Sequence, residues 1–272
     1  MEDDRLNAVV TKRVEVAPGL IILQARPDGW ELPDFTPGQF AILGLPSSAK
    51  RYWLSDPEGQ DIAEGSRMIK RPYSITTSSK NKEYLEFYIT MIRSGQLTPR
   101  LFNLLEGDRF YMSPKFRGLF TIDMAPPEAN IIMIATGTGL APFMSMIRSN
   151  MIMDAGRRFI IIHGARHSWD LGYRAELSTL SYHQRNLTYI PVVSRPEDER
   201  AGWVGMSGYV QNVWTRKIIK SITGFQPKPE DTHIFVCGSP DMTDSTVKLL
   251  ELDGFEVAKE GGKGQVHVEK YW

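Results

Sequence analysis

The segment Arg71-Pro72-Tyr73-Ser74 combines side chains that could together hold a phosphorylated ring compound. Pro72 restricts Arg71 to extended backbone, so we expect a strand that presents its side chains alternately. Arginine can bind a diphosphate through two parallel hydrogen bonds. Tyrosine offers a flat apolar face, and serine offers a hydroxyl to a ring nitrogen. An edge strand with a surface arginine has the same pattern, so this segment alone leaves both interpretations open.

A second candidate is the segment 131–142, IIMIATGTGLAP. Its four leading apolar residues predict a buried strand, Gly137 and Gly139 follow in a turn, and Pro142 suits the first turn of a helix. Backbone N–H groups at such a strand–turn–helix junction can bind a dinucleotide pyrophosphate. Pro142 stands where a third glycine would complete the dinucleotide fingerprint, so an ordinary tight turn remains an alternative.

A third candidate is the turn Gly95-Gln96-Leu97-Thr98. It follows a strand-like segment and opens a short predicted helix over Thr98–Leu105, with Thr98 as N-cap and Pro99 in the first turn. Backbone N–H groups at this turn would suit a phosphate. A simple capped helix explains the same residues.

Composition narrows the class of protein. A length of 272 residues predicts about two domains, and 32 basic residues balance 32 acidic ones, so no overall charge favours nucleic acid or a membrane surface. The N-terminus is acidic without an apolar run, and no stretch approaches the roughly 20 apolar residues of a membrane span. The single cysteine, Cys237, leaves no internal disulfide and no thiolate cluster. We therefore expect a cytoplasmic protein without membrane insertion. A monomer is our working expectation, although nothing in the composition fixes the oligomeric state.

The first part of the chain has the pattern of an antiparallel β structure. Short apolar runs separated by turn signals predict six or seven strands in a closed barrel or a sandwich. The polar segment Gly44–Lys70 is expected to form an extended loop, hairpin or lid. Strands are expected over Ala8–Val16, Leu20–Gln24, Gln39–Leu45, Tyr73–Thr76, Tyr84–Ile92, Arg109–Met112 and Leu119–Ile122.

From Glu128 onward, strand and helix patterns alternate, which predicts a mostly parallel sheet with ligands at the carboxyl ends of its strands. The predicted domains are therefore residues 1–124 and 128–272. Strands are expected over Ile131–Ala135, Phe159–His163, Thr188–Val193 and Ile234–Cys237, and helices over Phe143–Met153, Tyr173–His183, Tyr209–Ile222 and Asp241–Leu252.

Six segments, in their order and spacing, resemble the bacterial ferredoxin/flavodoxin–NADP reductases, from about Pro37 to Trp272. They are RPYS, LEFYITMIRSGQLTPRL, ATGTGLAPF, VVSRPE, VCGSPDM and VEKYW. The resemblance implies an FAD-binding antiparallel β-barrel over 1–124 and an NADP(H)-binding α/β domain over 128–272. It also implies electron transfer between NADP(H) and ferredoxin or flavodoxin, through hydride transfer at flavin N5 followed by one-electron steps. The segment 47–70 is longer than the resemblance leads us to expect.

On the FAD side, the resemblance implies that Arg71 contacts the pyrophosphate, Tyr73 stacks on the isoalloxazine and Ser74 lies near N5. The terminal Trp272 is expected against the adenine, with Tyr271 as a further candidate near the isoalloxazine. The remaining residues implied for the FAD site are Tyr88, Gln96, Leu97 and Thr98.

On the nucleotide side, the resemblance places Thr138 between flavin and nicotinamide, and lets Gly137 and Gly139 admit the NADP pyrophosphate. Cys237 and Gly238 would border the nicotinamide. The predicted catalytic residues are Tyr73, Ser74 and Cys237.

Preference for NADPH is implied by Arg166 and by the pair Ser194-Arg195, which match the family's contacts to the 2′-phosphate. The sequence departs from the bacterial members at Gly208-Tyr209, where they carry Gly-Arg. Tyr209 resembles the plastid-type reductases, in which a tyrosine stacks on the adenine. Because two arginines remain, we expect NADPH to be preferred over NADH.

Charge in the barrel part favours an acidic electron carrier as partner, because a basic rim would speed and orient its encounter. Two alternatives stay open: an NADH-linked reductase component of an oxygenase, and a non-catalytic flavin-binding subunit of a larger redox complex. Between residues 70 and 117, four acidic residues stand against nine basic ones, namely Lys70, Arg71, Lys80, Lys82, Arg93, Arg100, Arg109, Lys115 and Arg117.

Overall fold

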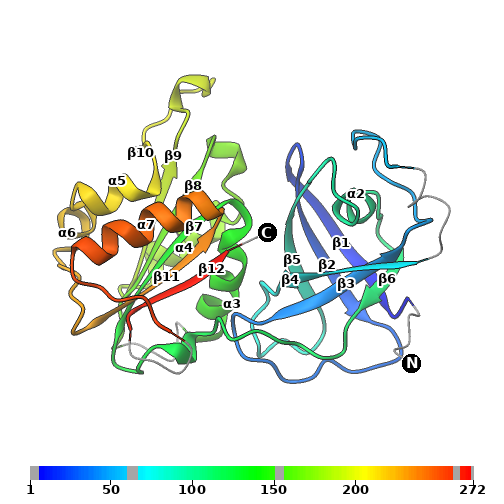
Figure 1. Cartoon of the computed structure of the whole chain (residues 1–272), viewed down its shortest axis with the longest axis horizontal. Coiled ribbons are helices and arrows are strands. Elements are labelled where there is room, and N and C mark those ends of the chain that lie inside the picture. The colour runs from blue at the N-terminus through cyan, green and yellow to red at the C-terminus, as the bar shows by residue number, and fades with distance from the viewer. Residues whose placement is uncertain (1–5, 60–66, 151–155, 260–263, 271–272) are drawn as a thin grey trace. The chain divides into compact units, whose positions relative to one another are not determined.

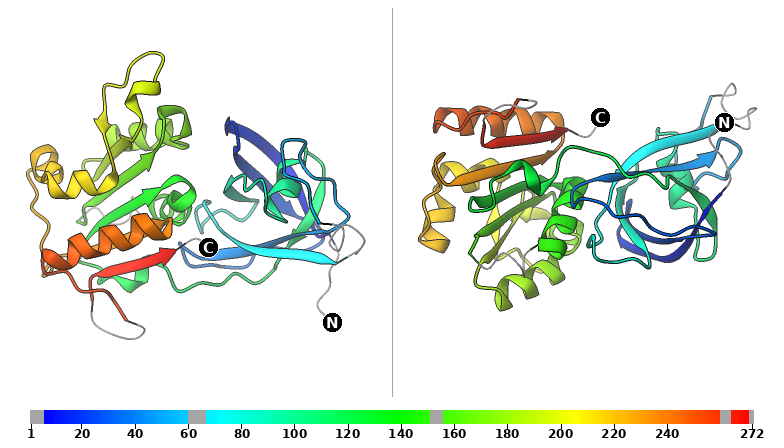
Figure 2. Two further views of the ribbon diagram at one scale, coloured as in Figure 1. Left: turned by 45° about the horizontal axis from the view of Figure 1, so that its top comes forward. Right: turned by 90° about the horizontal axis from the view of Figure 1, so that it is seen from below.

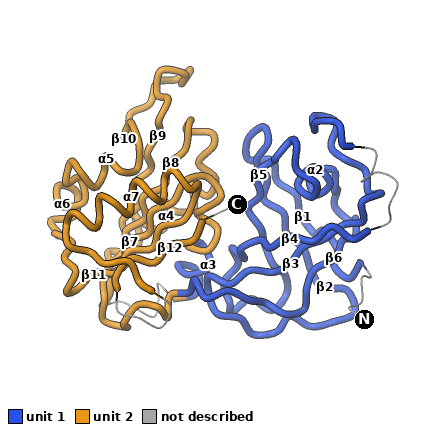
Figure 3. Tube along the Cα trace, viewed as in Figure 1, with its two compact units in different colours: residues 1–121, 144–149 blue, residues 122–143, 150–272 orange. Residues whose placement is uncertain are grey.

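The computed structural model describes residues 6–59, 67–150, 156–259 and 264–270. The chain divides into two compact units, which Figure 3 draws in blue and orange. Unit 1 comprises residues 1–121 with 144–149, and unit 2 comprises residues 122–143 with 150–272.

Unit 1 is built on a six-stranded antiparallel sheet with the strand order β4-β3-β6-β1-β2-β5. An isolated bridge between Ile75 and Phe87 connects the chain just after β4 with β5, so the two outer strands of the sheet meet. This confirms the predicted antiparallel, barrel-like architecture. The strands are β1 (Ala8–Ala17), β2 (Leu20–Pro27), β3 (Phe40–Pro46), β4 (Met68–Ser74), β5 (Leu85–Thr90) and β6 (Arg109–Met112) (Figure 1).

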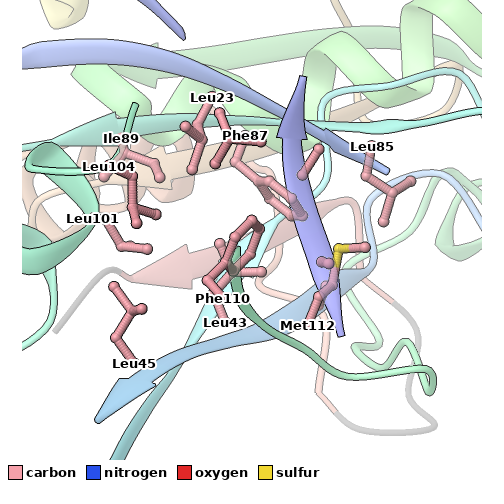
Figure 4. Close-up of a cluster of buried hydrophobic side chains, with 14 of the residues drawn as sticks. Leu23, Leu43, Leu45, Leu85, Phe87, Ile89, Leu101, Leu104, Phe110 and Met112 are labelled. Atoms are coloured by element: carbon pink, nitrogen blue, oxygen red, sulfur yellow. The ribbon is translucent and has the colours of Figure 1, made fainter. Parts of the chain in front are cut away.

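The core of unit 1 forms because alternate residues of these strands point inward. Leu23, Leu43, Phe87 and Phe110 are fully buried, and the side chain of Leu101 reaches them from α2 (Thr98–Phe102) (Figure 4). Full burial of one such side chain contributes about 1.5–3 kcal/mol. The packing of Leu101 therefore fixes α2, and with it the turn that leads into the helix.

Three predictions for unit 1 were wrong in detail. The segment Leu119–Ile122 is no strand; it leads into a 3-10 turn, Ile122–Met124. The loop predicted over Gly44–Lys70 is shorter, because β3 continues to Pro46 and β4 begins at Met68. Leu97, rather than Thr98, is the N-cap of α2, since the hydroxyl of Thr98 bonds to Ile92 instead.

Unit 2 contains a six-stranded parallel sheet with the strand order β10-β9-β8-β7-β11-β12, as predicted for a nucleotide-binding α/β domain. Its central strands are continuous apolar runs because helices cover both faces. The strands are β7 (Asn130–Thr136), β8 (Phe159–Ala165), β9 (Leu187–Val193), β10 (Met206–Ser207), β11 (Thr232–Gly238) and β12 (Val266–Lys270).

The helices of unit 2 cover the sheet from two sides (Figure 2). Val210 and Leu250, from α5 and α7, pack on one face with Ile132 and Ile162, whereas α4 contacts β9 on the other face. Short 3-10 turns lie at Gly137–Leu140, Ser168–Asp170 and Pro196–Asp198. The helices are α3 (Ala141–Asn150), which continues into unit 1, α4 (Arg174–His183), α5 (Val210–Thr215), α6 (Ile218–Thr223) and α7 (Pro240–Leu252).

Three elements of unit 2 differ from the sequence-based expectation, and one of them is the two-residue strand β10, which is too short to show a pattern and was not predicted. The single helix predicted over Tyr209–Ile222 is broken into α5 and α6, because Lys217 has a left-handed backbone with φ 54°. Strand β12 was not predicted, since Val266–Lys270 is polar in part and follows a glycine-rich segment. No helix in the described ranges is long and apolar enough to cross a bilayer.

Candidate functional site

In unit 1, strand β4 carries the first set of candidate residues. Arg71 and Tyr73 are two residues apart and therefore share one face of the strand. Arg71 is exposed, Tyr73 is half-buried, and Ser74 is buried beside the partner position Phe40 on β3. Burial raises the pKa of the Tyr73 phenol, so its ring is neutral over the whole physiological range. The strand thus presents one cation beside one neutral aromatic ring.

The structure brings the turn Gly95–Thr98 to Arg71. The guanidinium of Arg71 lies 3.5 Å from Gln96 Oε1, although the two residues are far apart in the sequence. Within the described ranges, the backbone N–H groups of Gln96, Leu97 and Thr98 donate to no protein acceptor. Thr98 Oγ1 donates to Ile92 O at 3.2 Å and accepts from Ile92 N–H at 3.0 Å, which shapes the turn.

These groups fit an anionic diphosphate. One exposed guanidinium and several backbone N–H groups without protein acceptors converge on a single turn, and both kinds of donor favour phosphate oxygens. Tyr88, on β5, is only 3% exposed, so its side chain is part of the barrel wall and offers little open surface to a ligand.

In unit 2, the candidate turn Gly137–Gly139 lies directly against the end of β11. A Cβ atom at Gly139 would stand 2.2 Å from the carbonyl oxygen of Cys237, so only glycine allows this approach. Gly137 has φ 53° and open space beside it, and Thr138 is half-buried between the two glycines. The fold therefore gathers Gly137, Thr138, Gly139, Cys237 and Gly238 at one place.

Sequence reasoning missed Glu269, which lies beside Cys237. Residues 237 and 269 are register partners in β11 and β12, and Cys237 Sγ donates to Glu269 Oε2 at 3.8 Å. Burial raises the pKa of the Glu269 carboxyl to about 7, so it carries a proton for part of the time at neutral pH. No local signal could have found this pair, because it depends on the parallel pairing of two strands.

The loops after β8 and β9 bring together the residues expected at the 2′-phosphate. Ser194 N–H donates to Ala165 O at 3.0 Å, and Arg195 N–H donates to Arg166 O at 2.9 Å, so both exposed arginines lie side by side. Gly208 N–H donates to Val193 O at 2.9 Å, which places the exposed Tyr209 beside the same loops. This end of the sheet offers two cations, a hydroxyl and an aromatic ring.

His167 connects these two loops through hydrogen bonds. Its Nδ1 lies 3.0 Å from Asp170 and its Nε2 lies 3.2 Å from Asp198, and Ser168 Oγ donates to Glu199 at 2.7 Å. Burial of the ring alone would lower the pKa of His167, but the hydrogen bonds with both aspartates outweigh it and raise the pKa. Three carboxylates of these loops, those of Asp170, Asp198 and Glu199, are thus engaged by His167 and Ser168.

The expected places of Trp272 and Tyr271 stay predictions, and that of Arg100 on a basic rim is wrong. Trp272 and Tyr271 lie outside the described residues. Arg100 was counted among the cations of a basic rim, but its side chain is 2% exposed and paired with Glu58, because residues 47–59 fold over α2. The remaining cations of that group are exposed or half-buried.

Comparison with known proteins identifies the family of the chain. Residues 133–248 match the family described as the oxidoreductase NAD-binding domain. The chain is 31% identical over 239 residues to the ferredoxin–NADP reductase of Azotobacter vinelandii, covering 84% of this chain and 83% of that protein. It is 30% identical over 243 residues to the flavodoxin/ferredoxin–NADP reductase of Buchnera aphidicola, covering 88% of each.

The fold of the chain is also similar to that of a solved reductase structure. A crystal structure of a ferredoxin NADP+ reductase from Neisseria gonorrhoeae with bound FAD and NADP superposes with a TM-score of 0.80, at 23% identity and 98% coverage of both chains. Fold and sites together define an oxidoreductase of the class that binds FAD and a pyridine nucleotide. The chain belongs to the bacterial flavodoxin/ferredoxin–NADP reductase family.

Proposed function

We propose that this protein is an FAD-dependent reductase that transfers electrons between NADP(H) and ferredoxin or flavodoxin, the partners named for its relatives. Residues 1–124 would bind FAD and residues 128–272 would bind NADP(H). The observation that supports this best is the turn Gly95–Thr98, where Arg71 and backbone N–H groups without protein acceptors converge.

In this proposal, Arg71 and the N–H groups of Gln96, Leu97 and Thr98 hold the diphosphate of FAD. Tyr73 supports one face of the isoalloxazine and Ser74 lies near its N5. When bound, FAD supplies a ring that accepts a hydride at N5 and passes electrons on singly. Tyr88 would contribute from the barrel wall and Trp272 from the C-terminus.

The residues of unit 2 would orient the nucleotide. Gly137, Thr138 and Gly139 would receive the pyrophosphate and the nicotinamide, and Cys237 with Gly238, which lie against this turn at the end of β11, would border the nicotinamide. Hydride transfer needs aligned rings and exclusion of water rather than a strong protein acid. Cys237 Sγ donates to Glu269 Oε2, and because burial raises the pKa of this carboxyl to about 7, it is protonated for part of the time at pH 7.

NADPH is the proposed nucleotide because Arg166, Ser194 and Arg195 come together at the carboxyl ends of β8 and β9. Each arginine can form charge-assisted hydrogen bonds with a 2′-phosphate, worth about 1.5–3 kcal/mol apiece. Tyr209, 69% exposed beside these loops, is proposed to stack on the adenine.

The proposed docking surface for the carrier lies on unit 1. Lys80, Lys115 and Arg117 are exposed cations, suited to an acidic partner. Trp53, 78% exposed after β3, adds an aromatic contact of the kind that anchors protein interfaces.

The test is an anaerobic spectrum of the purified protein before and after addition of NADPH. We expect a flavin spectrum that bleaches on addition, followed by reduction of added ferredoxin or flavodoxin. A strong preference for NADH would favour the oxygenase-type reductase instead. A flavin that stays oxidised with both nucleotides would favour a non-catalytic flavin-binding subunit, and a colourless protein that takes up no FAD would contradict all of these functions.

A further inference from the structure

The loop after β3, residues 47–59, lies near α2 (Figure 1), and its Arg51 side chain binds the turn Gly95–Thr98 that leads into this helix. The guanidinium of Arg51 donates to Gly95 O at 3.0 Å and to Arg93 O at 3.2 Å. It also donates to Asp56 O at 2.9 Å, within its own loop. The side chain of Arg51 is 16% exposed, so these bonds are largely shielded from water.

A second arginine holds the next carbonyl of the same turn. Arg100, on α2, donates from Nη1 to Gln96 O at 2.6 Å, and its Nη2 donates to Ser47 O in the loop. The carbonyls of residues 93, 95 and 96 therefore all face two guanidinium groups on one side of the turn.

Glu58 joins the two arginines. Its carboxylate accepts from Arg51 at 3.1 Å and from both Nη atoms of Arg100, at 3.1 and 2.7 Å. The hydrogen bond with Arg100 lowers the pKa of Glu58, so the carboxyl stays ionised. Two guanidinium groups and one carboxylate leave one net positive charge behind the turn.

The geometry of the peptide bond links this cluster to the open side of the turn. In a trans peptide, C=O of one residue and N–H of the next point in opposite directions. Because the carbonyls of Gly95 and Gln96 point toward the arginines, the N–H groups of Gln96 and Leu97 point away from them. In the described part of the chain, the N–H groups of Gln96 and Leu97 donate to no protein acceptor.

We propose that Arg51 and Glu58, from the loop 47–59, and Arg100, from α2, are positioning residues for the diphosphate of FAD. They fix the peptide planes that aim the N–H groups of Gln96 and Leu97, and their hydrogen bonds polarise those peptides toward an anion. None of the three contacts the flavin ring in this role. The inference rests on the proposed FAD site.

The test measures release of bound flavin from the purified holoprotein after dilution, by the rise in flavin fluorescence. Glu58→Gln should release FAD about ten-fold faster than the wild type, the size expected when one charged hydrogen bond is disturbed. The same measurement after exchange with riboflavin, which has no phosphate, should give equal rates for variant and wild type.

Arg51→Gln provides a second variant, because Arg51 lies nearer the surface and its loss leaves the Arg100–Glu58 pair intact. Arg51→Gln should also speed the release of FAD and leave the release rate of riboflavin unchanged. It tests the proposal on its own if Glu58→Gln does not fold. Glu86→Gln is the matched control, since it breaks the ion pair of Glu86 with Arg148, of similar burial and in the same unit. This control should leave FAD release unchanged.

The inference is overturned if both loop variants release FAD at the wild-type rate. It is equally overturned if they release FAD and riboflavin faster by the same factor, which would indicate a purely structural role. A wild-type protein that holds no FAD would instead refute the proposed function, so the two failures are distinguishable.

Discussion

Tyr73 is half-buried on β4 and shares a strand face with Arg71, so its ring is held in place before any ligand arrives. We expect Tyr73→Ala to weaken FAD binding about ten-fold or more, because the variant loses aromatic stacking and buried ring area. The measurement is the ratio of flavin absorbance to protein absorbance after gel filtration.

Tyr73→Phe keeps the ring and should retain FAD, which separates stacking from any effect of the hydroxyl. Tyr182→Ala, at an exposed position on α4, controls for the loss of a tyrosine elsewhere. Normal flavin content in Tyr73→Ala would contradict the stacking role.

Arg195 is exposed, and its backbone bonds to Arg166 at the carboxyl ends of β8 and β9. Arg195→Ala should raise the KM for NADPH about ten-fold and leave the KM for NADH nearly unchanged, because only NADPH carries the 2′-phosphate. Steady-state kinetics with both nucleotides provide the measurement.

Arg185→Ala is the matched control for Arg195, since Arg185 is an exposed arginine near the amino end of β9, opposite the loop that carries Arg195. It should change neither KM. Equal effects of Arg195→Ala on NADPH and NADH would exclude a contact with the 2′-phosphate.

At the scale of elements, the turn before α3 depends on its contact with β11. Gly139→Ala would place a Cβ atom 2.2 Å from Cys237 O, and backbone cannot yield as a flexible side chain does. We expect a loss of roughly 1–3 kcal/mol in the free energy of unfolding of unit 2, together with weaker NADP(H) binding. Urea unfolding followed by circular dichroism measures the first effect.

Gly156→Ala serves as the control for Gly139→Ala, because no heavy atom lies within 4 Å of a Cβ there. Its unfolding free energy should stay within about 0.5 kcal/mol of the wild type. If Gly139→Ala were equally neutral, the tight approach of the turn to β11 would be wrong.

At the scale of the whole molecule, buried titratable groups make stability depend on pH. Burial lowers the pKa of His163 and of His267 to about 4, and lowers that of His233, which stacks on His267. The unfolded chain binds protons to these rings that the folded chain does not. Their contribution is therefore present above about pH 6.5 and is lost as pH falls toward 4.

Glu269 acts in the opposite direction, because its pKa is raised from 4.5 to about 7. The folded chain keeps a proton that the unfolded chain releases, so this contribution is present below about pH 4.5 and is lost as pH rises through 7. Each proton corresponds to a slope of at most about 1.4 kcal/mol per pH unit.

We therefore expect Glu269→Gln to steepen the loss of stability between about pH 6.5 and 4.5 and to flatten the curve between about pH 6.5 and 7. Urea unfolding at a series of pH values provides the measurement, and Glu251→Gln, on the exposed side of α7, is the control. Identical pH profiles for wild type and Glu269→Gln would show that Glu269 is not buried as described.

Features that depend on local pattern could be predicted from the amino-acid sequence. Apolar alternation predicted the antiparallel strands of unit 1, and longer apolar runs between helices predicted the parallel sheet of unit 2, as observed. Pro72 and the spacing of Arg71 and Tyr73 predicted their strand. Even here, Lys217 broke a predicted helix, because a single left-handed residue leaves almost no trace in a hydrophobic pattern.

Contacts between residues far apart in the chain became known only from the fold. Glu269 reaches Cys237 because β12 pairs in parallel with β11, and Glu58 reaches Arg100 because the loop 47–59 folds over α2. Both pairs join residues more than 30 positions apart, 32 and 42 respectively. Periodicity encodes the burial of each element one by one, whereas contacts between elements depend on strand order, register and the path of connecting loops.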